Sequence, residues 1–219
     1  MTEQSILKDF DQQMSAEERQ LMDGLDTPAK VQAFLDEIPY PGGEENRSAL
    51  EVLRQRRAHC LDGGLFAAAA LRRQGFPARI LDLQPEEGMD DDHVLALYRR
   101  DGCWGAVAKS NYSGLRFREA IFRSLHELVV SYFENFFNTG GVKTLRYYTG
   151  VIYLRRFDHI NWMGSAQGVD AIEQLLKTIK VKALLTPAQS EHLSPVDFRS
   201  YQAGTLGLNP DGVYQPKKD

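Results

Sequence analysis

Residues 57–113 read RAHCLDGGLFAAAALRRQGFPARILDLQPEEGMDDDHVLALYRRDGCWGAVAKSNYS and hold the most reactive side chains of the chain in an ordered series. Cys60 opens an apolar, alanine-rich run that is typical of a buried helix. The run ARILDL at 78–83 then predicts a strand, His93 heads a second strand, and CWGAVAK at 103–109 predicts a third. We therefore expect one helix followed by three strands, with a thiol at the start of the helix and an imidazole at the start of a strand.

Cys60 is a candidate nucleophile because of its place at the helix start. The first backbone N–H groups of a helix have no intrahelical partner and carry partial positive charge, which stabilises a thiolate. The helix is apolar nearly all round, through Leu61, Leu65, Phe66, Ala69 and Leu71. The alternative is that Cys60 is one more small core residue, because free cysteines are among the most buried residue types.

His93 is the candidate base. The run HVLALYRR has apolar residues on both faces, as a central strand does, and Asp101-Gly102 predicts the hairpin turn to the returning strand. Antiparallel pairing across that turn would bring Ser110 or Asn111 beside His93, where a third group can orient an imidazole. The alternatives are that His93 only caps a strand after an acidic loop and that Ser110-Asn111 is an ordinary turn.

The run HCLDGGLFAAAALRRQGFPARIL, residues 59–81, resembles the nucleophile helix and following strand of the transglutaminase-like superfamily. His93, followed by a strand, a turn and Trp104, resembles its second catalytic block. The resemblance implies an α+β fold with a cysteine-protease-like core, in which a central Cys-bearing helix packs on an antiparallel sheet. One departure is clear, because AVAKSNYS at 106–113 lacks the Asp that this superfamily carries after the Trp. An Asn carbonyl can replace that acid, which keeps Asn111 a candidate.

The resemblance implies cysteine-dependent acyl transfer or amide hydrolysis on a peptide, protein or small amide substrate. Cys60 would attack a carbonyl and form a thioester, His93 would take and return the proton, and Ser110 or Asn111 would orient His93. Neither a cofactor nor a metal is expected. The alternative is a catalytically inactive fold that acts as a binding or scaffolding domain, which the missing Asp favours. An arylamine-type acyltransferase using acyl-CoA is a third possibility, but the sequence has no clear site for the CoA phosphates.

We expect a single domain over 1–219, with N-terminal helices at 1–58, the transglutaminase-like core at 59–138 and a C-terminal extension at 139–219 packed on the core. Helix starts are marked by three predicted capping boxes, at Ser15, Ser48 and Ser124, and by Thr27-Pro28, so helices precede and follow the core. The basic run at 116–123 is expected to be a solvated approach to the helix that Ser124 caps.

Composition limits the partners and the compartment. With 219 residues and a net charge of −4, the chain gives no reason to expect nucleic acid or an anionic membrane as a partner. The longest apolar run, LFAAAAL, is too short to span a bilayer, and residues 1–22 lack a secretory signal. Two cysteines exclude a disulfide scaffold, so a cytoplasmic location is expected. The oligomeric state is left open.

The sequence leaves two alternatives for each of two loops. The segment IPYPGGEEN at 38–46 lies just before the Cys60 helix and is either a wall of the cleft or an ordinary connector. The segment GTLGLNPDGVYQPKKD at 204–219 is polar and rich in turn residues, which predicts a stretch draped over the surface or partly disordered.

Overall fold

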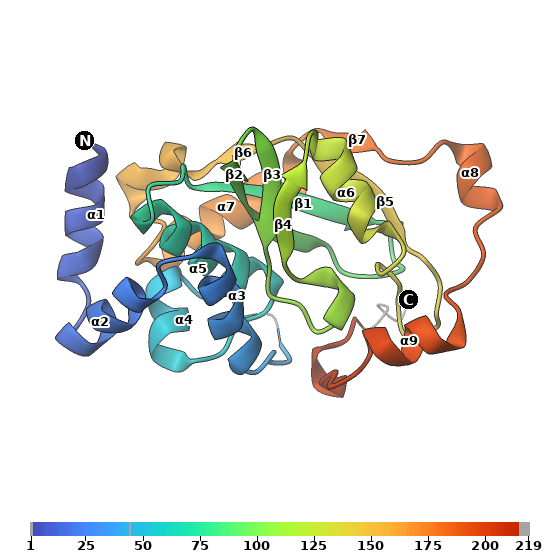
Figure 1. Cartoon of the computed structure of the whole chain (residues 1–219), viewed down its shortest axis with the longest axis horizontal. Coiled ribbons are helices and arrows are strands. Elements are labelled where there is room, and N and C mark those ends of the chain that lie inside the picture. Colours follow the sequence, from blue (N-terminus) through green and yellow to red (C-terminus); the bar gives the residue numbers. More distant parts are fainter. Residues whose placement is uncertain (1, 44, 215–219) are drawn as a thin grey trace.

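The computed structural model describes residues 2–43 and 45–214, and it combines helices with an antiparallel sheet in an α+β fold (Figure 1). The N-terminal helices lie at one end of the molecule, the sheet occupies the middle, and α8 and α9 lie at the opposite end (Figure 1). The helices are α1 (Glu3–Gln12), α2 (Ala16–Gly24), α3 (Pro28–Glu37), α4 (Ala49–Gln55), α5 (Cys60–Arg73), α6 (Leu125–Phe133), α7 (Ala166–Thr178), α8 (Pro187–Glu191) and α9 (Phe198–Gly204). Short 3-10 turns are η1 (Ser113–Leu115), η2 (Leu154–Ile160) and η3 (Pro210–Gly212).

The sheet is built around β1 and β2. Its strands are β1 (Arg79–Pro85), β2 (His93–Arg100), β3 (Cys103–Val107), β4 (Arg118–Phe122), β5 (Leu145–Thr149), β6 (Ile152–Tyr153) and β7 (Val181–Ala183). The order is β4-β3-β2-β1-β5-β7, with β6 paired to the start of β1, and every pairing is antiparallel. The hairpin between β2 and β3 turns at Asp101 and Gly102, both with positive φ, as the sequence predicts.

Helix α5 packs against one face of β2 at very short range. A Cβ built on Gly64 would lie 2.7 Å from Val94 Cγ1, so only glycine allows this approach. Val94 and Ala96 belong to the same buried cluster as the apolar side chains of α5. Helix α5 begins at Cys60 and contacts β1 and β2 in the middle of the sheet.

Helix α6 covers the other face. Leu95 and Leu97 alternate with Val94 and Ala96 along β2 and pack in a second cluster with Leu128 of α6. The two faces of β2 are thus both covered, which explains why HVLALYRR is apolar on both sides.

Most helix starts follow the predicted signals. Ser15 and Ser48 each form a complete capping box, and the side chains of Thr27 and Ser124 accept backbone N–H groups at the starts of α3 and α6. The segment 116–123 differs from the prediction. Residues 118–122 form the edge strand β4, because alternating REAIF can pair with β3.

Segments that are distant in sequence meet at Arg72. Its guanidinium donates to both carboxylate oxygens of Asp158, at 2.6 and 2.9 Å, and to both of Glu3, at 2.5 and 2.9 Å. Arg72 is 2% exposed. This ion pair fixes α1 and η2 against the C-terminal end of α5. Beyond residue 138, β5 pairs with β1, so the C-terminal segment contributes a strand to the central sheet.

The Arg72→Met variant is expected to lose about 3 kcal/mol in the free energy of unfolding, because two carboxylates keep their charge without the buried guanidinium. Arg73→Met is the matched control: its partners Asp11 and Asp23 lie at the surface, and a cost of about 1 kcal/mol or less is expected. Urea unfolding of both variants measures the difference. Equal losses would contradict the assigned role of Arg72.

Candidate functional site

A cleft of about 910 Å³ opens beside the N-terminus of α5, and we call it the Cys60 cleft. Its walls are residues 40–43, the first turn of α5, Asp91 and Asp92 before β2, one side of α7, and the segment 211–214. The predicted loop at 38–46 thus contributes a wall of this cleft, as one of its two interpretations required. Most of its charged lining is acidic, because Asp170 and Glu173 of α7 face it together with Asp91 and Asp92.

Cys60 is the first residue of α5 and is partly exposed. Its thiol donates to the carbonyl oxygen of Asp92 at 3.5 Å. Removal from bulk water raises the pKa of the Cys60 thiol well above its usual value, and the carboxylate of Asp92 raises it further. Both effects favour the neutral thiol over the thiolate. Burial also raises the pKa of Tyr40, and the adjacent Cys60 thiol adds to this rise.

His93 lies on the face of the sheet opposite to α5. It pairs with Leu83 of β1, one position before the pair formed by Val94, so its side chain alternates with that of Val94. Its Nε2 donates to the Leu115 carbonyl at 2.7 Å, and its ring stands edge-on to Phe136. His93 is 4% exposed, and burial lowers its pKa to about 4. The imidazole is therefore neutral at pH 7 and is held by groups on the α6 side.

Ser110 and Asn111 lie near His93 around a small cavity of about 40 Å³, as the hairpin pairing predicts. Their hydrogen bonds go elsewhere. Ser110 Oγ accepts from the Tyr112 N–H at 3.0 Å, which is a local turn. The side chain of Asn111 forms hydrogen bonds with the main chain of Asn209 and Gly212. The small cavity and the Cys60 cleft share a wall that contains Tyr40, Asp92 and Gly212. The structure thus groups three of the four predicted residues and places Cys60 on the other side of this wall.

The side chain of Asn111 binds the main chain of Asn209 at two points. Asn111 Nδ2 donates to the Asn209 carbonyl, and Asn111 Oδ1 accepts the Asn209 N–H, each at 2.8 Å. Asn111 Nδ2 also donates to the Gly212 carbonyl at 3.0 Å. On the opposite side, Asn209 Nδ2 donates to the Tyr40 carbonyl at 2.8 Å. The segment 209–214 is thereby fixed between the loop at 40–43 and Asn111, with residues 211–214 in the Cys60 cleft.

Buried hydrogen bonds from Lys109 and Gln32 hold the segment before Asn111 against α3. Lys109 is 5% exposed and donates to the carbonyls of Leu35 and Ile38 at 2.7 and 2.5 Å. The side chain of Gln32 bonds both the N–H and the carbonyl of Ala108, at 3.1 and 3.0 Å. The sequence interpretation missed both residues, and they fix the segment before Asn111 to α3.

Comparison with known proteins gives little. No protein-family model matches the chain, and no curated protein does. Among solved structures, the chain is similar to Legionella pneumophila LapG at 13% sequence identity with a TM-score of 0.40, over 81% of this chain and 95% of that one. A likeness at this level assigns neither a family nor an activity.

Two searches for other kinds of site were negative within residues 2–43 and 45–214. Among these residues, no group of three or more His, Cys, Asp or Glu side chains could hold a metal ion. In the same part of the chain, no helix is long and apolar enough to cross a membrane.

The thiol of Cys60 is expected to react slowly with iodoacetamide at pH 7 in the native protein, no faster than that of Cys103, because its pKa is raised. The His93→Gln variant should leave the rate unchanged, whereas Asp92→Asn should increase it by removing a nearby negative charge. Mass spectrometry of the two cysteine peptides over a pH series measures these rates. Fast alkylation well below about pH 8.5 that depends on His93 would contradict this geometry.

Protonation of His93 is expected to destabilise the fold in acid. Its pKa falls from 6.5 to about 4 on folding, so the unfolded chain binds the proton first. Stability is unaffected above about pH 6.5, falls progressively as the pH drops from 6.5 to 4, and is lower by about 3 kcal/mol below pH 4. Unfolding free energies of wild type and His93→Gln between pH 4 and 7 should diverge accordingly. Parallel curves would show that the ring is not buried in its neutral form.

Proposed function

We propose that this chain is a peptide-binding domain, a transglutaminase-like fold without turnover, whose ligand lies in the Cys60 cleft. The observation that carries the proposal is the double hydrogen bond from the Asn111 side chain to the main chain of Asn209. A side-chain amide that pairs with both backbone groups of one residue recognises an extended peptide without regard to its side chain. The chain's own Asn209, which has an extended backbone just before the 3-10 turn η3, takes the place of one residue of such a ligand.

The surroundings of Cys60 favour binding over catalysis. A thiolate nucleophile needs a base within hydrogen-bond reach, and the imidazole of His93 instead donates to Leu115 on the opposite face of the sheet. The raised pKa of Cys60 and the lowered pKa of His93 both favour the neutral forms, so a thiolate–imidazolium pair is disfavoured at pH 7. The missing Asp after Trp104 agrees with this.

The charges of the cleft indicate the kind of peptide. Asp91, Asp92, Asp170 and Glu173 line it, and Lys177 forms an ion pair with Glu173 at 2.9 Å. Electrostatic complementarity therefore favours a peptide with basic side chains on the α7 side of the cleft. Asn111 would bind the main chain, and the acidic wall would select the side chains.

A labelled peptide of residues 207–214, GLNPDGVY, has no basic side chain and tests the main-chain recognition by Asn111 alone. The Asn209→Ala variant loses the bond to Tyr40, so its own segment should leave the groove more readily and the added peptide should bind about fivefold more tightly than to wild type. Asn111→Ala should abolish binding of the peptide, in the single variant and in combination with Asn209→Ala. Fluorescence anisotropy measures the affinity.

The matched control is Asn46→Ala in the Asn209→Ala background, because Asn46 lines the cleft but makes no hydrogen bond to this segment among the described residues. The control should bind the peptide as tightly as its parent. Equal binding with and without the Asn111 amide, or no binding to any variant, would exclude the proposed groove. Circular dichroism of each variant verifies that it is folded.

A second candidate is cysteine-dependent acyl transfer or peptide hydrolysis, which the position of Cys60 favours. It begins α5, is partly exposed in the cleft, and lies beside the Tyr40 hydroxyl. In this mechanism His93 would leave Leu115 and accept the thiol proton, Ser110 or Asn111 would orient it, and water or an amine would resolve the thioester. Incubation with p-nitrophenyl acetate tests it. A burst of nitrophenol with acetyl on Cys60, absent in Cys60→Ser, would favour this candidate.

A further inference from the structure

A row of alternating arginines and aromatic rings crosses the sheet near β6. The guanidinium carbon of Arg99 lies 5.3 Å from the ring centre of Trp104, and that of Arg79 lies 5.6 Å from the same ring. Arg79 also lies 5.2 Å from the ring of Tyr153, and Arg155 lies 6.0 Å from it. Two aromatic rings thus join three guanidinium groups in one continuous row.

Strand register explains the row. Arg79 pairs with Tyr153 between β1 and β6, and Arg99 pairs with Trp104 between β2 and β3. Paired residues in an antiparallel sheet project from the same face. Arg79 shares its face with Leu81 by the two-residue repeat, so the row lies on the α6 side of the sheet.

Among the described residues these arginines form no close ion pair, although the pKa of Glu3 is lowered by its hydrogen bond with Arg72 and, to a smaller extent, by the charge of Arg155. In the part of the chain that the structure describes, neither Arg79, Arg99, Arg155 nor Arg156 forms an ion pair. The Nε–H of Arg79 is buried and has no hydrogen-bond partner. Stacking on a ring satisfies the face of a guanidinium and leaves the N–H groups at its edge available.

The nearest carboxylates are already bound. Glu3 and Asp158 line the same region, and Arg72 binds each of them through two hydrogen bonds. Arg72, Arg155 and Arg156 together outnumber these two carboxylates by one positive charge, although the whole chain is acidic. An excess of unpaired guanidinium groups costs free energy through repulsion, and a bound anion would remove that cost.

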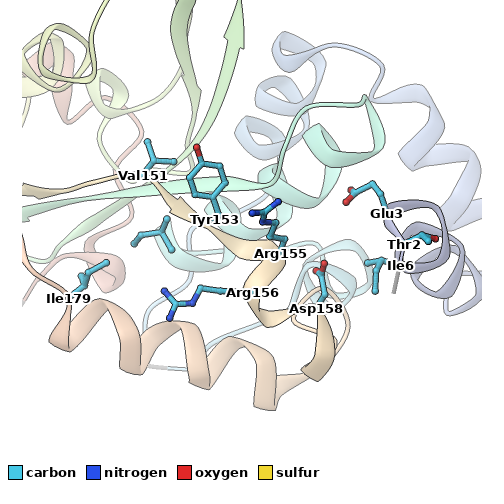
Figure 2. Close-up of a pocket in the computed structure, with 10 residues that line it drawn as sticks. Thr2, Glu3, Ile6, Val151, Tyr153, Arg155, Arg156, Asp158 and Ile179 are labelled. Atoms are coloured by element: carbon cyan, nitrogen blue, oxygen red, sulfur yellow. The ribbon is translucent and has the colours of Figure 1, made fainter.

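A pocket of about 660 Å³ lies at this end of the row, and we call it the arginine pocket. Arg155 and Arg156 line it together with Tyr153, and Tyr153 is 45% exposed. Figure 2 shows the two arginines on the same segment with their side chains pointing in different directions, Arg155 toward Tyr153 and Arg156 toward Ile179. Val151, Ile152 and Ile179 add an apolar wall.

We propose that the arginine pocket binds a small phosphate monoester. Arg155 and Arg156 would hold the phosphate oxygens, because the planar guanidinium fork matches oxyanions and a phosphate monoester carries nearly two negative charges. Arg79, stacked on Tyr153, adds a third positive charge behind the ring. The apolar wall receives the organic part of the ligand. This site is separate from the Cys60 cleft, and its chemistry does not depend on the proposed peptide binding.

Calorimetric titration with phenyl phosphate and with inorganic phosphate, in buffer whose ionic strength is matched with sodium chloride, tests the proposal on the full chain. Phenyl phosphate is expected to bind at least about threefold more tightly than inorganic phosphate, because its ring buries apolar surface against Val151 and Ile179. In the double variant Arg155→Gln/Arg156→Gln, the affinity for phenyl phosphate should fall at least about tenfold.

Two further variants make the result specific. Arg123→Gln removes an exposed arginine outside the pocket and should bind phenyl phosphate as wild type does. Arg155→Lys/Arg156→Lys keeps the charge without the fork and should bind with intermediate affinity. Absence of binding to the wild type, or equal affinity in the double glutamine variant and wild type, overturns the proposal. Thermal unfolding without ligand verifies that the variants are folded.

Discussion

The pairing register between β1 and β2 decides the chemistry of the candidate site. Asp82 pairs with Val94 and Leu83 with His93, so Val94 meets α5 while the imidazole turns to the α6 side. Gly64 strengthens this choice, because its missing side chain lets α5 approach Val94 and sets the Cys60 thiol over the backbone at Asp92. A slip of one residue would exchange the two faces and bury Leu95 against α5. The sheet is covered on both sides, so such a slip would disturb two packed layers at once, and the observed separation of thiol and imidazole is correspondingly robust.

Local signals in the sequence predicted most of the fold. The α5 helix, the Asp101-Gly102 hairpin and the helix caps each depend on a few neighbouring residues, and all are present. The direction of His93 could not be predicted in the same way, because HVLALYRR is apolar on both faces and its alternation does not say which face meets α5. The hydrogen bonds between Asn111 and Asn209 join residues 98 positions apart, so no local sequence pattern predicts them. The predicted catalytic roles of Cys60, His93, Ser110 and Asn111 stay predictions.

Net charge was a poor guide to the surface for a related reason. The total of −4 averages over regions of opposite sign. The segment after Gly150 contributes charges of both signs. Arg155 and Arg156 of η2 line the arginine pocket, and Asp170 and Glu173 of α7 line the Cys60 cleft. A ligand responds to the field close to its own site, within about one Debye length of 8–10 Å. The two sites can therefore favour ligands of opposite charge in one acidic chain.

The ion pairs of Arg72 also have a consequence for how the protein is made. Glu3 is synthesised before Arg72, but the carboxylate of Asp158 and the β5 strand beside β1 are synthesised well after it. At roughly 5–20 residues per second, the ribosome delivers them several seconds after α5 is complete. During that interval one edge of β1 has no neighbour, and the α5 surface that η2 will cover stays open. A nascent chain stalled between Arg73 and Leu145 should therefore be a better substrate for chaperones than the finished protein.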